Sequence, residues 1–336
     1  MLPRPEIQDL LHHGGGLRVA AERYGIPLAD WLDVSTGINP RGWPVPAMPA
    51  ATWSRLPEDS DGLEQAAREY YCAEYLLPVA GSQAAIQALP QLRVRARVSV
   101  LNFGYAEHAH TWRRAGHAVT LVNAEELNDA VAKSDVMVLI HPNNPTGARF
   151  ETKQLLDWHA QLAMHGGWLV IDEAFMDATP ENSVASHTAH PGLIVLRSLG
   201  KFFGLAGARV GFVCAHPQLL SQLANLLGPW SVNAPARWVA SAALKDRAWQ
   251  DNARRRLLDD SARLRMLLTR HNLAPHGGCA LFHWTCIANA EQLHTRLAQR
   301  GILTRLFFDP LSVRFGLPET EADWTRLDAA LFDLVE

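Results

Sequence analysis

A lysine in a glycine-rich loop is the first residue in this sequence whose surroundings indicate chemistry. Ser198 precedes Lys201 by three residues, and Arg209 follows it by eight. A serine hydroxyl and the planar fork of an arginine suit the oxygens of one phosphate group. Residues 193–196 are a short apolar run, typical of a buried strand, so we expect the loop to begin at a sheet end. An amine beside a phosphate site predicts pyridoxal phosphate, an aldehyde that enzymes hold as a Schiff base to lysine.

The lysine spacing alone leaves other interpretations open. Ser-x-x-Lys also occurs in serine acylases, where Ser198 would be the nucleophile, and by chance in surface loops. The residues that follow the other predicted strands are therefore needed to distinguish between these possibilities.

Two predicted strands end in side chains that suit a pyridine ring. The strand over residues 168–171 leads directly to Asp172. A carboxylate beside a pyridine nitrogen keeps that nitrogen protonated, so the ring withdraws electrons more strongly. The strand over residues 136–140 leads to a proline-rich loop that offers Asn143 or Asn144 as a directed amide.

A third strand, residues 98–101, is followed by Phe103 and Tyr105, and either offers a flat face for a ring. From residue 60 onward, short apolar strands alternate with helices of about ten residues, which predicts an α/β fold with a mostly parallel sheet covered on both sides. Ligands of such sheets bind beyond the carboxyl ends of the strands, so we expect these residues to share one site. The expected strands are residues 76–79, 98–101, 118–122, 136–140, 168–171 and 193–196, and the expected helices are 62–71, 84–92, 107–115, 124–133 and 152–165.

Two glycine-containing stretches are further candidates for anion binding. Residues 80–83, Ala-Gly-Ser-Gln, connect a predicted strand to a helix, an arrangement that directs backbone N–H groups at a phosphate. Residues 12–16, His-His-Gly-Gly-Gly, free the backbone to wrap an anion. Residues 35–40 form a turn rich in groups that bond their own backbone. The first 40 residues are therefore expected to be an arm that contributes to the site.

The C-terminal third predicts a second domain. Apolar spacing indicates one or two long helices between residues 234 and 271, followed by short strands and helices. Arg305 and Arg314 belong to predicted strands over residues 303–307 and 313–315, and an arginine that faces a cleft can clamp a carboxylate, although an exposed ion pair is an alternative for Arg305. The predicted organisation is an N-terminal arm joining the small domain, a large α/β domain and a small α+β domain: residues 1–40, 41–230 and 231–336.

The composition indicates a globular protein whose partners are small molecules. Its 336 residues are 48% hydrophobic and 19% charged, with a formal net charge of −3. That length predicts more than one core, and the balance excludes disordered and fibrous classes. No basic run suits a nucleic acid, and no window is apolar enough to span a membrane. The four cysteines show neither zinc spacing nor a disulfide framework, which indicates reduced thiols and a cytoplasmic location.

Three motifs in a fixed order resemble a known family. Asn-Pro-Thr-Gly, then Asp-Glu-Ala, then Ser-x-x-Lys with an arginine eight residues later resemble the aspartate-aminotransferase family of pyridoxal-phosphate enzymes, fold type I. The resemblance implies that Lys201 is the Schiff-base lysine and Asp172 the pyridinium partner. It implies that Tyr105 stacks on the ring and Asn144 bonds its 3′ oxygen. The residues that it implies for the cofactor phosphate are Ser82, Gln83, Ser198 and Arg209.

The ends of the chain narrow this resemblance. His-Gly-Gly near the N-terminus, residues 35–40, Tyr105-Ala-Glu-His108 and Arg314-Phe-Gly-Leu-Pro318 are similar to the threonine-phosphate decarboxylases of cobalamin biosynthesis, more than to histidinol-phosphate aminotransferases. The similarity implies decarboxylation of L-threonine O-3-phosphate to (R)-1-amino-2-propanol O-2-phosphate by a homodimer. The substrate-binding residues that it implies are His13, Gly14, Gly37, Asn144, Arg305 and Arg314.

Four residues depart from the family pattern, and two rival functions stay open. Gly16 and Gly37 stand where asparagine is common, Leu56 where a tyrosine often reaches the neighbouring subunit's cofactor phosphate, and Phe175 where aminotransferases carry tyrosine. The same residues could perform transamination, for example on histidinol phosphate. A non-catalytic effector-binding protein would be expected to have lost the lysine or the acid and to carry a DNA-binding segment, and the sequence shows neither change.

Overall fold

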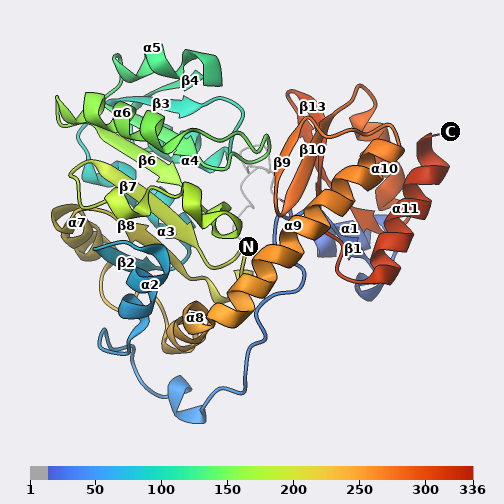
Figure 1. Cartoon of the computed structure of the whole chain (residues 1–336), viewed down its shortest axis with the longest axis horizontal. Coiled ribbons are helices and arrows are strands. Elements are labelled where there is room, and N and C mark those ends of the chain that lie inside the picture. The colour runs from blue at the N-terminus through green and yellow to red at the C-terminus, as the bar shows by residue number, and fades with distance from the viewer. Residues whose placement is uncertain (1–13, 336) are drawn as a thin grey trace, which may run out of the picture.

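The computed structural model describes residues 14–335, which form three sheets surrounded by helices (Figure 1). The strands are β1 (Leu32–Asp33), β2 (Leu76–Val79), β3 (Arg97–Leu101), β4 (Ala118–Val122), β5 (Val136–Ile140), β6 (Trp168–Asp172), β7 (Leu193–Ser198), β8 (Gly211–Cys214), β9 (Gly277–Cys279), β10 (Phe282–Cys286), β11 (Ile302–Leu303), β12 (Arg305–Phe308) and β13 (Leu311–Gly316). The α-helices are α1 (Leu17–Tyr24), α2 (Leu63–Tyr71), α3 (Ser82–Ala88), α4 (Glu107–Arg114), α5 (Leu127–Val131), α6 (Thr152–Ala163), α7 (Pro217–Leu227), α8 (Ala234–Lys245), α9 (Arg247–Arg270), α10 (Ala290–Ala298) and α11 (Glu321–Val335).

The largest sheet has seven strands in the order β2-β8-β7-β6-β5-β3-β4. Strands β4, β3, β5, β6 and β7 are parallel, whereas β8 runs antiparallel to both of its neighbours. The predicted α/β fold with a mostly parallel sheet is confirmed. The carboxyl ends of β2, β3, β5, β6 and β7 therefore meet at one edge of the sheet, together with the amino end of β8.

Two apolar clusters cover the two faces of this sheet. Side chains of successive strand residues point to opposite faces. Val170 and Ile194 accordingly pack in one cluster with Ala85 of α3, whereas Ile171 and Val195 pack in the other. Strand β5 is buried along its whole length, because it has a strand on each side and helices on both faces. Strand β4 differs, because it is an edge strand and most of its residues are exposed or half-buried.

A second sheet of four antiparallel strands, β12-β13-β10-β9, lies on the other side of the molecule (Figure 1). Helix α9 runs between this sheet and the large one. The segment expected as one or two helices is two, because Asp246 ends α8 and its side chain caps α9 by accepting a hydrogen bond from Trp249 N (3.0 Å). None of the helices between residues 14 and 335 is long and apolar enough to cross a bilayer.

The N-terminal segment is attached to the small-sheet side. Strand β1 pairs in parallel with β11, and the N–H of Gly316 donates to Val34 O (2.7 Å). A Cβ at Gly316 would lie 2.3 Å from Thr36 O, so only glycine allows this close approach. The chain between β1 and α2 then contacts the loop that follows β7, where Asn39 N donates to Lys201 O (2.9 Å) and Trp43 N to Phe203 O (2.8 Å). The division of the chain at residues 40 and 230 stays a prediction.

Candidate active site

A cavity of about 310 Å³ lies at the edge where the strand ends meet, between the two main sheets. Residues from both sides of the molecule line it. The predicted site residues among them are Gly14, Gly37, Ser82, Gln83, Tyr105, Asn144, Asp172, Ser198, Lys201, Arg209, Arg305 and Arg314. His13, the remaining predicted site residue, lies outside the described residues.

Lys201 reaches the cavity from the loop that follows β7. That strand extends through Ser198, two residues beyond the predicted run, because Ser198 pairs with Gly211 at the start of β8. Burial, followed by the positive charge of Arg314, lowers the pKa of Lys201 from 10.5 to about 8. The amine lies over the ring of Phe175, 5.4 Å from its centroid. A larger fraction of Lys201 is therefore neutral near pH 8, which suits an amine nucleophile.

Asp172 ends strand β6 and is almost completely buried, with an exposed fraction of 4%. Its Oδ1 atom accepts a hydrogen bond from Ala174 N (3.0 Å), and its Oδ2 atom lies 2.9 Å from Nε2 of His108. His108, in the first turn of α4, is buried as well. We did not predict this partner from the sequence. The available signal was its position three residues after Tyr105, which is weak for a single histidine.

Arg209 and the turn after β2 form a candidate phosphate cradle. Both Gly81 and Arg209 have positive φ angles, 72° and 51°. Gly211 allows Ser82 to approach, because a Cβ at residue 211 would lie 2.5 Å from Ser82 N. Helix α3 begins at Ser82, so the first backbone N–H groups of the helix have no partner within it. The residues of this candidate cradle that line the same cavity are Ser82, Gln83, Ser198 and Arg209.

Replacing Gly81 with alanine is expected to weaken cofactor binding through Arg209. The new Cβ would lie 2.6 Å from Nη2 of Arg209, so that side chain would have to move out of the cradle. Hydrogen bonds to charged groups contribute about 1.5–3 kcal/mol, so the dissociation constant of pyridoxal phosphate should rise by roughly tenfold or more. Gly116→Ala is the matched control, because Gly116 has a similar φ of 87° and open space around it. Equal affinities of the two variants in an absorbance titration would contradict this prediction.

A short chain of hydrogen bonds orients Tyr105. Its hydroxyl donates to Oε1 of Gln83 (3.1 Å), and Nε2 of Gln83 donates to Oε2 of Glu107 (2.9 Å). Burial and the negative charge of Glu107 raise the pKa of Tyr105 to about 12, so the phenol stays neutral. The side-chain amide of Gln83 is already used in these two hydrogen bonds. We therefore expect the backbone N–H of Gln83, rather than its side chain, to bind a phosphate.

The small-sheet side contributes two arginines on the same face of a strand pair. Arg305 of β12 and Arg314 of β13 are directly opposite each other in the antiparallel register, so their side chains share one face. Arg314 donates through Nη2 to Ser35 O (2.7 Å) and through Nη1 to Oδ1 of Asn144, and its buried Nε atom has no partner. Burial, followed by the charge of Arg305, lowers the pKa of Arg314 to about 10.

The charges around the cavity are strongly unbalanced. Four cationic side chains line it, and Asp172 is the one carboxylate among its lining residues. Such an excess of positive charge in a buried site suits a ligand with several anionic groups. The four cations are Lys201, Arg209, Arg305 and Arg314. Their positive charges would attract a cofactor phosphate, a substrate phosphate and a substrate carboxylate.

Comparison with known proteins agrees with this geometry. The family description "Aminotransferase class I and II" matches residues 56–330. The chain belongs to this family. It is 57% identical to the threonine-phosphate decarboxylase of Pseudomonas aeruginosa over 97% of the chain and 99% of that protein, and 40% identical to that of Sinorhizobium sp. over 95% and 97%. The structure of histidinol-phosphate aminotransferase from Sinorhizobium meliloti in complex with pyridoxal-5'-phosphate matches with a TM-score of 0.84 and 21% identity, over 99% of this chain and 97% of that one. That likeness shows the fold.

Two of the four departures from the family pattern, Gly37 and Phe175, are neighbours in space. A Cβ at Gly37 would lie 2.7 Å from Cε1 of Phe175 and 3.0 Å from Cδ1 of Phe282. The rings of Phe175 and Phe282 meet edge to face, with centroids 5.1 Å apart. Phe175 therefore occupies the room that a side chain at residue 37 would need. The other two departures are far less constrained, because Gly16 has open space around it and Leu56 is 63% exposed.

Proposed function

We propose that this chain is a pyridoxal-phosphate-dependent carboxy-lyase that converts L-threonine O-3-phosphate into (R)-1-amino-2-propanol O-2-phosphate in cobalamin biosynthesis. The near full-length match to threonine-phosphate decarboxylases carries this proposal. The charges of the cavity support it, because the substrate brings both a carboxylate and a phosphate to a site that has an excess of cations.

The residues of the cavity fit pyridoxal phosphate. Lys201 would hold it covalently, since its amine is buried and has a lowered pKa. Asp172 would hold the ring nitrogen, Tyr105 the ring face and Asn144 the 3′ oxygen. The residues that would hold its phosphate are Ser82, Gln83, Ser198 and Arg209. Bound pyridoxal phosphate supplies a ring that accepts the electron pair released when a bond at the substrate's α-carbon breaks.

The arginines of the small sheet would decide which bond breaks. The bond that lies perpendicular to the ring aligns with its π system, so the anchoring of the other substituents selects the reaction. Arg314 would bind the substrate carboxylate and fix its orientation. Arg305 and the backbone at Gly14 would hold the substrate phosphate at the other end of the cavity, and Gly37 would line the substrate site. The ammonium of Lys201 would be the acid that returns a proton to the α-carbon.

Product analysis tests this proposal against transamination. The purified chain with pyridoxal phosphate should release carbon dioxide from L-threonine O-3-phosphate and form the phosphorylated amino alcohol in equal amount, with no need for a keto acid. The rival aminotransferase would form glutamate from 2-oxoglutarate and histidinol phosphate. Glutamate formation without carbon dioxide would overturn the proposal, and a non-catalytic protein would give neither product.

We also propose that the chain acts as a cytoplasmic homodimer. Trp53, Leu56 and Trp230 are large apolar side chains with exposed fractions of 72%, 63% and 59%. Trp53 and Leu56 belong to the long segment between β1 and α2, and a second copy is the partner that would cover them. All four cysteines are free, which suits a reducing compartment. Sedimentation of the purified chain should give twice the mass of one chain.

A further inference from the structure

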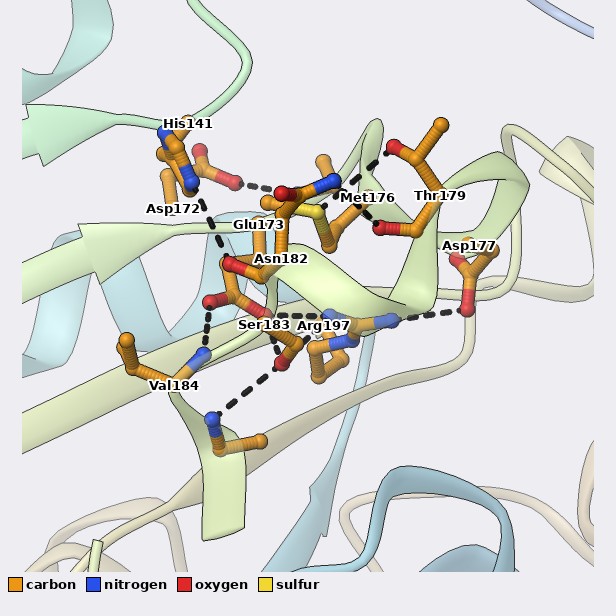
Figure 2. Close-up of polar contacts among 12 residues, drawn as sticks. His141, Asp172, Glu173, Met176, Asp177, Thr179, Asn182, Ser183, Val184 and Arg197 are labelled. Atoms are coloured by element: carbon orange, nitrogen blue, oxygen red, sulfur yellow. Dashed lines mark hydrogen bonds and ion pairs between the residues drawn. The ribbon is translucent and has the colours of Figure 1, made fainter. Parts of the chain in front are cut away.

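A network of buried charges lies directly behind two of the cofactor-binding residues (Figure 2). Glu173 follows Asp172 in the chain, and Arg197 precedes Ser198. Arg197 donates through Nη1 to Oε2 of Glu173 and through Nη2 to Oδ1 of Asp177 (2.8 Å). The side chains of all three network residues are at most 2% exposed, which is rare for charged groups.

The network lies on the face of the sheet opposite to the side chains of Asp172 and Ser198. Strand residues alternate between faces, so Glu173 and Arg197 point away from the side on which Asp172 and Ser198 lie. The two apolar clusters support this assignment, because Leu196, two residues before Ser198, packs in one cluster and Ile171, two residues before Glu173, packs in the other. The ends of β6 and β7 therefore carry Asp172 and Ser198 on one face of the sheet and the ion pair on the other face.

The ion pair continues the connection between β6 and β7 where their backbone pairing stops. The last paired residues are Asp172 and Leu196, and the N–H of Glu173 donates to Leu196 O (2.9 Å). Beyond that point the backbones of the two segments are no longer paired, and the ion pair between Glu173 and Arg197 joins the segments. Asp177 belongs to the 3-10 turn Met176–Ala178, which follows Phe175, so the same guanidinium also holds the turn beside the lysine amine.

Additional contacts hold the network rigidly. Glu173 accepts hydrogen bonds from the hydroxyl of Ser183 (2.5 Å) and from Val184 N (2.9 Å), as Figure 2 shows. The guanidinium of Arg197 lies over the ring of Tyr71, 4.5 Å from its centroid. Arg254, on helix α9, donates through Nε to Asp177 O (3.0 Å) and so links the network to the helix that leads to the small sheet. Since buried ion pairs contribute little to stability relative to apolar residues, their value here needs another explanation.

We propose that Glu173, Arg197 and Asp177 are positioning residues that fix the separation of Asp172 and Ser198, and thereby the affinity of the site for pyridoxal phosphate. The inference rests on the proposed function for the identity of the cofactor. It predicts that weakening the network loosens the cofactor even though no member of it lines the cavity.

Glu173→Gln is the main test, because it keeps the size of the side chain and removes its charge. The variant should raise the dissociation constant of pyridoxal phosphate by about tenfold, the lower end of what lost supporting contacts cost behind metal ligands. Ser183→Ala removes one hydrogen bond to Glu173 and should give a smaller increase, which keeps the test valid if the first variant folds poorly. The readout is an absorbance titration of cofactor-free protein, together with its unfolding temperature.

Asp135→Asn is the control, because Asp135 and Arg97 join the starts of β5 and β3 by a more exposed ion pair (2.8 Å) at the opposite end of the same sheet. Its cofactor affinity should equal that of the unchanged chain. Equal affinities of all variants, with lower unfolding temperatures for the network variants alone, would show a purely structural network and overturn the inference. If the unchanged chain itself fails to bind pyridoxal phosphate, the proposed function fails as well, which separates the two outcomes.

Discussion

Lys201→Ala is expected to abolish covalent capture of pyridoxal phosphate and to lower kcat/KM for L-threonine O-3-phosphate by at least about 10⁴-fold, since it removes the attachment point and the general acid together. Arg209 and Asp172 would remain, so the variant should still bind the cofactor non-covalently. Borohydride reduction followed by peptide mapping measures the effect directly. The unchanged chain should carry the reduced cofactor on Lys201, and the variant should carry none.

The pH dependence of capture gives a second check on the same residue. The amine reacts when it is neutral, and its pKa is lowered to about 8 in the folded protein. The rate of cofactor capture by cofactor-free protein should therefore rise with pH and reach half of its maximum near pH 8, whereas an ordinary lysine would need a pH near 10.5. Lys153→Ala is the control, because Lys153 is exposed and pairs with Asp157 on the surface of α6. Full turnover by Lys201→Ala would contradict the proposed function.

Asp172→Asn is expected to lower kcat by about 10³-fold with a smaller change in KM, because an amide cannot hold the ring nitrogen in its protonated form. The substitution keeps the size of the side chain, and its amide oxygen can still accept the hydrogen bond from Ala174 N. The loss should therefore come from charge rather than from packing. Steady-state kinetics of carbon dioxide release, with the unfolding temperature measured in parallel, distinguish the two causes.

A chemically altered cofactor provides the matching control. A pyridoxal phosphate analogue methylated on the ring nitrogen carries its positive charge without any help from Asp172. It should restore part of the activity of Asp172→Asn and give none of this benefit to Lys201→Ala. A variant that stays as active as the unchanged chain would contradict the role assigned to Asp172.

The sequence by itself was sufficient for the α/β fold and for most residues of the cavity. Strands such as β5 and β6 are continuous apolar runs, because both faces of the central sheet are buried, and such runs are visible without a structure. Asp172 could be named because it ends one such run, and Lys201 because it lies in the loop after another, β7. The carboxyl ends of these neighbouring parallel strands share one edge. Their chemical roles stay predictions that the experiments above test.

The tertiary structure decided the pairings between residues that are far apart in the chain. His108 meets Asp172 across 64 residues, and Arg314 meets Asn144 across 170. The room at Gly37 is filled by Phe175, and Arg197 meets Glu173 behind the cavity. Each of these contacts depends on strand order, register and the side of the sheet on which a side chain lies. Local propensity and motif spacing do not specify those three properties. A single sequence therefore shows which residues lie at the strand ends, but it does not show which distant residues they contact.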